Sequence, residues 1–120
     1  MTRDETERLD DLAEAIRRIR SIDTRAPASA ADATARDAIL YNLVIIGEAV
    51  KHLGGHTRAR AADIPWRRIA GLRDLLTHEY FRIEMDAIRD IVDRDLPPLE
   101  RAVNELRRPG GGTEARAKKA

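Results

Sequence analysis

Apolar residues recur every three or four positions along most of the chain, which is the spacing of one face of an α-helix. Residues 3–22 predict a first helix, and Thr2 and Glu5 have capping-box spacing at its start. Its apolar stripe consists of Leu9, Leu12, Ile16 and Ile19. Runs that alternate apolar and polar residues and are rich in β-branched or aromatic side chains are absent from the sequence. The pattern therefore predicts an all-α fold.

A second helix is predicted over residues 34–53, after a loop over residues 23–31 that contains Pro27. Thr34 and Asp37 suit a capped start, and Gly54-Gly55 end the helix. The apolar stripe is widened by further residues and runs nearly all round: Ile39, Leu40, Leu43, Val44, Ile45, Ile46, Val50 and Leu53. Such a helix is typical of a central position, or of burial on two sides with one side against a partner subunit.

A polar segment, residues 55–63, precedes a short third helix that starts at Ile64-Pro65-Trp66, with Pro65 in a first-turn position. Gly71 lies inside this helix and costs about 1 kcal/mol relative to Ala. A close approach of another backbone to Gly71 would explain why glycine stands there.

A fourth helix is predicted from Glu84 onward. Pro97-Pro98 interrupt it, so that either the helix kinks there or it stops and a fifth helix begins with Asp95 as its cap. Its apolar face consists of Met85, Ile88, Val92, Leu96, Leu99, Val103 and Leu106. The short links between the helices predict an up-down four/five-helix bundle over residues 1–108. The Gly-, Lys-, Arg- and Ala-rich residues 109–120 predict a disordered basic tail.

Composition narrows the possible chemistry. The chain has 120 residues, enough for one domain, and no cysteine, which excludes disulfides and thiolate chemistry. The net charge is only +1, although 19 of the 22 basic residues are Arg, whose guanidinium suits phosphate. Aromatic residues are too few for a platform that stacks single-stranded bases. No apolar run approaches the roughly 20 residues needed to span a bilayer, and the N-terminus is charged, so we expect a cytoplasmic protein without a membrane partner.

Several site types are excluded or disfavoured. The only serines, Ser21 and Ser29, lie near a loop, and no glycine-rich phosphate loop follows a strand. His52 and His56 have the spacing of a metal pair, but Gly54-Gly55 between them is expected to break the helix. We therefore expect no metal site and no cofactor.

The candidate chemistry lies on the third helix, in Arg73, Asp74, His78 and Tyr80. On a helix Asp74 and His78 share a face, while Arg73 and Tyr80 lie almost on one line two turns apart. With so many Arg residues, an Arg five residues before a His arises easily by chance. One interpretation is therefore a plain surface helix with an Asp74 salt bridge and Tyr80 packed at its end.

The functional interpretation is metal-independent RNA cleavage. An imidazole such as that of His78 can take the proton of a ribose 2′-hydroxyl near neutral pH. Arg73 can neutralise the developing charge on the phosphate oxygens, and Asp74 can orient the imidazole. Acid–base cleavage uses two proton-transfer groups, and the chain offers one suitable His. A two-fold homodimer that brings both copies of His78 to one cleft would supply the second.

The spacing Arg73, four residues, His78, one residue, Tyr80 resembles the signature of the HepT-like toxins, within the HEPN superfamily of helical ribonucleases. Asp74 fits the polar position that follows the Arg in that superfamily. The resemblance covers about residues 3–107 and includes four further segments: Arg36-Asp37-Ala38-Ile39, Ile46-Gly47-Glu48-Ala49, Ile64-Pro65-Trp66-Arg67-Arg68-Ile69-Ala70-Gly71-Leu72 and Asp95-Leu96-Pro97-Pro98-Leu99.

The resemblance implies a homodimerising bundle of HEPN type that acts as the ribonuclease toxin of a type VII-like toxin–antitoxin pair. Arg73 and His78 of both chains would line the catalytic cleft, with Asp74 in support. The partner would be a minimal nucleotidyltransferase antitoxin, in a hetero-oligomer with the dimer, that transfers AMP to Tyr80 and so silences the enzyme. The alternative is a non-catalytic helical subunit that docks a nucleotidyltransferase.

Overall fold

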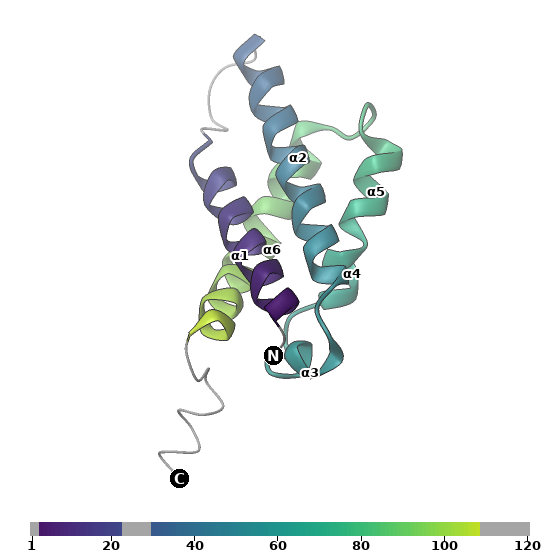
Figure 1. Cartoon of the computed structure of the whole chain (residues 1–120). Helices are drawn as coiled ribbons and strands as arrows, with labels where there is room; N and C mark the ends of the chain where they lie inside the picture. The colour runs from purple at the N-terminus through teal and green to yellow at the C-terminus, as the bar shows by residue number, and fades with distance from the viewer. Residues whose placement is uncertain (1–2, 23–29, 109–120) are drawn as a thin grey trace.

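Residues 3–22 and 30–108 are described by the structure, a computed structural model, and all of their regular structure is helical. The long helices are α1 (Arg3–Arg20), α2 (Ala30–Lys51) and α6 (Met85–Arg107), and α5 (Leu72–Glu79) is shorter. Two single-turn helices, α3 (Gly55–Ala59) and α4 (Trp66–Ala70), lie between α2 and α5. The predicted all-α fold is confirmed, and α1, α2, α5 and α6 run alternately up and down (Figure 1).

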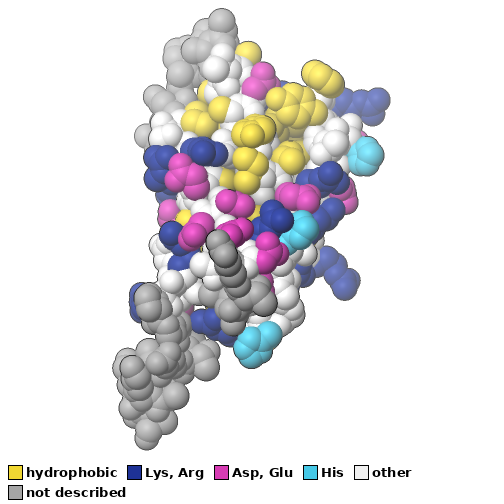
Figure 2. All heavy atoms as spheres, in the orientation of Figure 1, with side chains coloured by type: hydrophobic (Ala, Val, Ile, Leu, Met, Phe, Trp, Pro, Cys, Tyr) yellow, Lys and Arg dark blue, Asp and Glu magenta, His cyan; other side chains and the backbone are white. Residues whose placement is uncertain are grey.

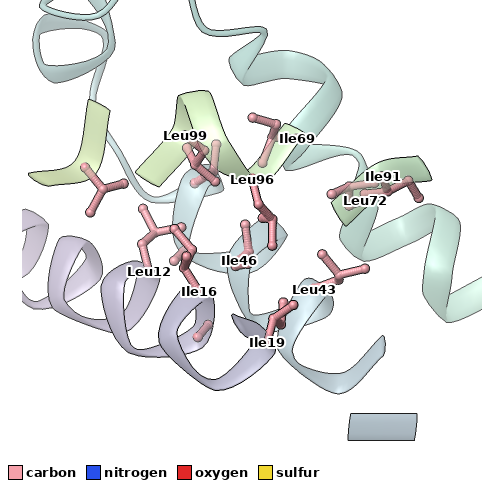
Figure 3. Packing of buried hydrophobic residues seen from close by; sticks show 14 of the residues in the cluster. Leu12, Ile16, Ile19, Leu43, Ile46, Ile69, Leu72, Ile91, Leu96 and Leu99 are labelled. Atoms are coloured by element: carbon pink, nitrogen blue, oxygen red, sulfur yellow. The ribbon is translucent and has the colours of Figure 1, made fainter. Parts of the chain in front are cut away.

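The centre of the bundle is α2, which packs against α1, α4, α5 and α6. The predicted apolar stripe of the first helix is confirmed, because Leu9, Leu12, Ile16 and Ile19 are all buried. Figure 3 shows how side chains from α1, α2 and α6 point toward one another to form one core. The central position predicted for the second helix is thus confirmed.

Two predicted segments are wrong. The helix α2 begins at Ala30 instead of residue 34, because the alanines before Thr34 favour helix and carry it past the predicted cap. The polar segment 55–63 contains the helix α3, whose start is held when Glu5 of α1 accepts a hydrogen bond from the backbone N–H of Gly54 at 3.2 Å. The predicted loop falls largely on residues 23–29, and the predicted tail is residues 109–120; both lie outside the described residues.

The predicted third helix is two helices, α4 and α5, that meet at Gly71. A Cβ at Gly71 would contact only the carbonyl oxygens of Arg67 and Arg68 in its own preceding turn, both at 3.4 Å. The expectation of a close backbone approach at Gly71 is therefore wrong. The close approach occurs at Gly47 of α2, where a Cβ would lie 2.7 Å from the backbone nitrogen of Arg73.

The helix α6 neither stops nor restarts at its two prolines, since it runs unbroken through Pro97 and Pro98. These prolines lack the N–H groups that would bond the preceding turn. The helix persists because Leu96 and Leu99, on either side of the prolines, are fully packed into the core. Tertiary burial thus outweighs the local cost of the prolines.

An ion pair between half-exposed Arg68 and buried Asp95 joins α4 to α6. Asp95 is 3% exposed and accepts a hydrogen bond from Arg68, with the Nε of Arg94 at 3.3 Å. We expect Arg68→Ala to lower the free energy of unfolding by about 1–3 kcal/mol, because the buried carboxylate loses a charged donor. Urea unfolding of this variant beside Arg67→Ala, at the exposed neighbouring position, measures the effect. Equal midpoints for the two variants would contradict it.

Candidate functional site

The helix α5 presents the predicted site residues to solvent. Its Leu72 and Leu76 are buried in the core and fix how the helix is rotated about its axis. Arg73, Asp74 and His78 are therefore exposed, because they occupy other faces of the same helix. The side chains with candidate chemistry are held by a rigid, packed element and remain accessible to a ligand.

Arg73 is held in place by two carboxylates. Its Nε lies 3.2 Å from Oε2 of Glu48 on α2, and its terminal nitrogen lies 3.1 Å from Oδ1 of Asp74. The other oxygen of Glu48 lies 3.2 Å from Nε2 of His52, so one carboxylate of α2 joins a histidine to Arg73. All of these side chains are more than one third exposed, so the cluster orients Arg73 more than it stabilises the fold.

Asp74 lies between two cations. It pairs with Arg73 and with Nζ of Lys51, whose distance to Oδ1 is 3.4 Å. The hydrogen bond from Arg73, followed by the charge of Lys51, holds the pKa of the Asp74 carboxyl below its ordinary value. Within residues 3–22 and 30–108, no hydrogen bond or ion pair joins Asp74 to His78. The orienting role of Asp74 toward the imidazole stays a prediction.

His78 stands apart from Arg73 in the single chain. It is exposed, and in the described part of the molecule its ring makes no hydrogen bond or ion pair. Five residues of helix separate it from Arg73, so the two side chains leave the axis about 140° apart. A phosphate that both groups contact would have to reach around α5, or be approached by a second chain.

Tyr80, directly after α5, is held by Arg36 of α2. One terminal nitrogen of Arg36 donates to the carbonyl oxygens of Tyr80 at 2.5 Å and Ile83 at 2.9 Å. The same guanidinium lies 5.6 Å from the centre of the Tyr80 ring, a cation–π distance. The carboxylate of Asp37, the residue after Arg36 on α2, acts on the phenol of Tyr80 and raises its pKa. The turn that links α5 to α6 is therefore tied to α2 at the Tyr80 ring and backbone.

The Tyr80 phenol offers a direct test of this geometry. Burial is the largest cause that raises the pKa of the phenol above its ordinary value. The Asp37 carboxylate, as a hydrogen-bond acceptor and as a negative charge, raises it further. In a Tyr41→Phe background, absorbance titration should show Asp37→Asn lowering the pKa. In the unfolded chain the phenol has its ordinary, lower pKa, so it loses its proton at a lower pH than in the folded chain. The free energy of unfolding is therefore unaffected below about pH 10 and falls above it. An unchanged pKa in Asp37→Asn would contradict the contact.

The two histidines considered as a metal pair are separated, as predicted, by the end of a helix. His52 follows the last residue of α2, whereas His56 lies in α3. Across residues 3–22 and 30–108, no group of three or more His, Asp or Glu side chains is placed to hold a metal ion. No helix within these same ranges is long and apolar enough to cross a membrane.

Beside Arg73 the surface is hollowed into a pocket of about 360 Å³ between α1, α2 and α5. Its floor is apolar and its walls are charged, from the residues Arg8, Asp11, Val44, Ile45, Glu48, Ala49 and Arg73. Figure 2 shows apolar side chains gathered over α2 with acidic and basic side chains at their border. The pocket gives Arg73 a concave neighbour that could receive part of a ligand.

Several of these positions were missed by sequence reasoning. Glu48 and Arg36 stood only within segments that resemble the family, without a role, and Asp37 was considered only for the capped start of the second helix. His52 was considered only for metal, and Arg8 and Asp11 were given no role. The i, i+4 spacing of Glu48 and His52 was the one local signal, because the remaining contacts join different helices.

Comparisons with known proteins identify the class to which this bundle belongs. The profile of the family described as "Ribonuclease HepT-like" matches residues 12–106. The chain is 33% identical over 111 residues to "Probable ribonuclease HepT" of Thermococcus cleftensis, covering 90% of this chain and all of that protein. The chain belongs to the HepT-like ribonuclease family, and the predicted resemblance is confirmed.

Other relatives match a shorter part. The chain is 42% identical over 69 residues to "Putative RNase TTE0752" of Caldanaerobacter subterraneus subsp. tengcongensis, covering 58% of this chain and 62% of that protein. It is 35% identical over 68 residues to "Putative RNase MJ1380" of Methanocaldococcus jannaschii, covering 57% of this chain and 62% of that protein. The chain thus spans less than two thirds of the length of these two relatives. No solved structure matches the chain.

Proposed function

We propose that the chain is a metal-independent ribonuclease and the toxin of a type VII-like toxin–antitoxin pair, with Arg73 and His78 as its catalytic residues. The observation that carries the proposal is the match to a ribonuclease family over residues 12–106. It is supported by the exposure of both side chains on a helix that the core holds rigidly. RNA is the substrate class, and no cofactor is required.

The chemistry assigns one step to each residue. His78 takes the proton of the ribose 2′-hydroxyl as that oxygen attacks the adjacent phosphorus, and the bond to the 5′-oxygen breaks. Arg73 neutralises the charge that develops on the non-bridging oxygens. A second proton donor must protonate the leaving 5′-oxygen. His78 of a second copy fills this role in a homodimer with two-fold symmetry.

The outward face of α2 supports the homodimer. Tyr41 is 63% exposed on this face, one helical turn before Val44 and Ile45, which line the pocket beside Arg73. The proposed contact is centred on Tyr41. An apolar area of this kind, bordered by charged side chains (Figure 2), is typical of a protein–protein contact. The face ends at the Glu48–Arg73 pair, so a dimer formed there would bring two copies of Arg73 toward one cleft.

Tyr80 is the proposed regulatory position, where a minimal nucleotidyltransferase antitoxin transfers AMP. The Asp37 carboxylate already acts on the phenol, so the added phosphate would bring a second anion near it. Like-charge repulsion then drives the ring from α2, and the bulk of the nucleotide lies near the catalytic helix. Intact mass after co-expression with the antitoxin measures the AMP on Tyr80.

Incubation of RNA with the purified chain in excess chelator tests the ribonuclease. We expect cleavage products that end in a 2′,3′-cyclic phosphate, because the 2′-hydroxyl is the nucleophile. Intact RNA across a range of substrates, offered to dimeric and unmodified protein, would reject the activity.

A second candidate is a non-catalytic subunit that docks a nucleotidyltransferase. It is favoured by one observation, the engagement of Arg73 with two carboxylates at 3.2 and 3.1 Å, which offsets the charge that a phosphate would need. Under this alternative the chelated assay shows no cleavage while the complex with the antitoxin still forms. A plain structural bundle predicts neither cleavage nor a complex.

A further inference from the structure

The pocket beside Arg73 combines an apolar floor with charged walls. Val44, Ile45 and Ala49 of α2 form the floor, and its volume of about 360 Å³ falls within the range of about 300–1,000 Å³ typical of ligand sites. Because Arg73 lies in its wall, a ligand that fills the pocket also lies next to the group proposed to bind the phosphate.

Two side chains of the pocket are free to bind a ligand. In the part of the chain that the structure describes, neither Arg8 nor Asp11 makes a hydrogen bond or ion pair, whereas Glu48 is engaged by Arg73 and His52. Arg8 and Asp11 are three residues apart on α1, so they lie on the same face of that helix. The wall of α1 therefore presents one set of donors and one set of acceptors to the same space.

This combination suits a nucleobase better than a phosphate. Two guanidinium groups and two carboxylates line the pocket, so their charges balance and a bare anion gains little. A flat base covers the apolar floor and uses its edges for hydrogen bonds. Guanine matches both free side chains, because its O6 and N7 accept from an Arg fork and its N1–H and 2-amino group donate to a carboxylate.

We propose that this pocket holds a guanine of the RNA substrate next to the phosphate bound by Arg73, with Arg8 and Asp11 as specificity-determining residues. The assignment rests on the proposed ribonuclease function, because RNA supplies the base. Adenine fits less well, since its N1 accepts hydrogen bonds and faces the Asp11 carboxylate. Uracil has a single N–H and lacks the O6–N7 pair.

Binding of uncleavable RNA tests the assignment. The probes are fluorescein-labelled 2′-O-methyl pentanucleotides, UUGUU, UUIUU and UUAUU, where I is hypoxanthine, which lacks the 2-amino group. Anisotropy titration of the whole chain should show UUGUU binding about tenfold more tightly than UUAUU, as expected for hydrogen bonds to charged groups, with UUIUU between them. Asp11→Ala should remove the preference for UUGUU over UUIUU, and Arg8→Ala should weaken binding of UUGUU.

Matched controls are Asp93→Ala and Arg101→Ala, exposed positions on α6, which should bind like the unchanged chain. Equal or absent binding of the three probes, as when a second copy covers the pocket, would overturn the assignment. A guanine preference that persists in Asp11→Ala would do the same. None of these readouts needs cleavage, so a failure of the pocket assignment is distinguished from a failure of the ribonuclease in the chelated assay.

Discussion

Replacing His78 with alanine is expected to lower RNA cleavage by about 100-fold or more, the usual loss when a general acid–base group is removed. The ring is exposed and unbonded in the described molecule, so the stability should change by less than about 0.5 kcal/mol. The chain should still form the same oligomer. Expression of the variant without antitoxin should no longer inhibit growth.

His56→Ala is the matched control, because His56 is also exposed but lies in α3, away from α5. The measurements are initial rates in chelator, thermal unfolding and sedimentation of both variants. A folded His78→Ala protein that retains full cleavage and toxicity would contradict the catalytic assignment. A chain inactive both with and without His78 would instead favour the docking subunit.

Gly47→Ala is expected to destabilise the protein and to impair the site together. Inside a helix this change normally stabilises by about 1 kcal/mol. Here the added Cβ would lie 2.7 Å from the backbone nitrogen of Arg73 and 3.2 Å from the carbonyl oxygen of Ile69. Backbone must move, so we expect a loss of about 1–3 kcal/mol from overpacking, which lowers Tm by about 4–8 °C per kcal/mol.

The same shift moves Arg73 away from Glu48, so cleavage should fall even at temperatures where the variant is folded. Gly55→Ala is the control, since nothing lies within 4 Å of a Cβ built there. Calorimetry and cleavage rates of both variants measure the two effects. A Gly47→Ala protein as stable and as active as Gly55→Ala would show that α2 and α5 are not in close contact.

The missed helix α3 and the unresolved course of α6 at its prolines have one physical origin. The period of apolar residues identified α1, the centre of α2 and the apolar face of α6. A helix that buries one face has apolar residues every three or four positions, so this burial can be recognised from the local sequence. This spacing did not reveal α3, whose start depends on Glu5 from a distant helix. The spacing also could not predict whether the helix continues through Pro97 and Pro98. It continues because the packing of Leu96 and Leu99 into the core outweighs the local cost of the prolines.

The sequence by itself determined the all-α fold, the family, and the placing of Arg73, Asp74, His78 and Tyr80 on or next to one helix, because each depends on spacing along the chain. Tertiary structure alone decided which partners those side chains have. Glu48 on α2 holds Arg73, and Arg36 holds Tyr80. Such contacts join helices distant in the sequence, so they depend on how α2 and α5 pack, and Gly47 sets how closely they do.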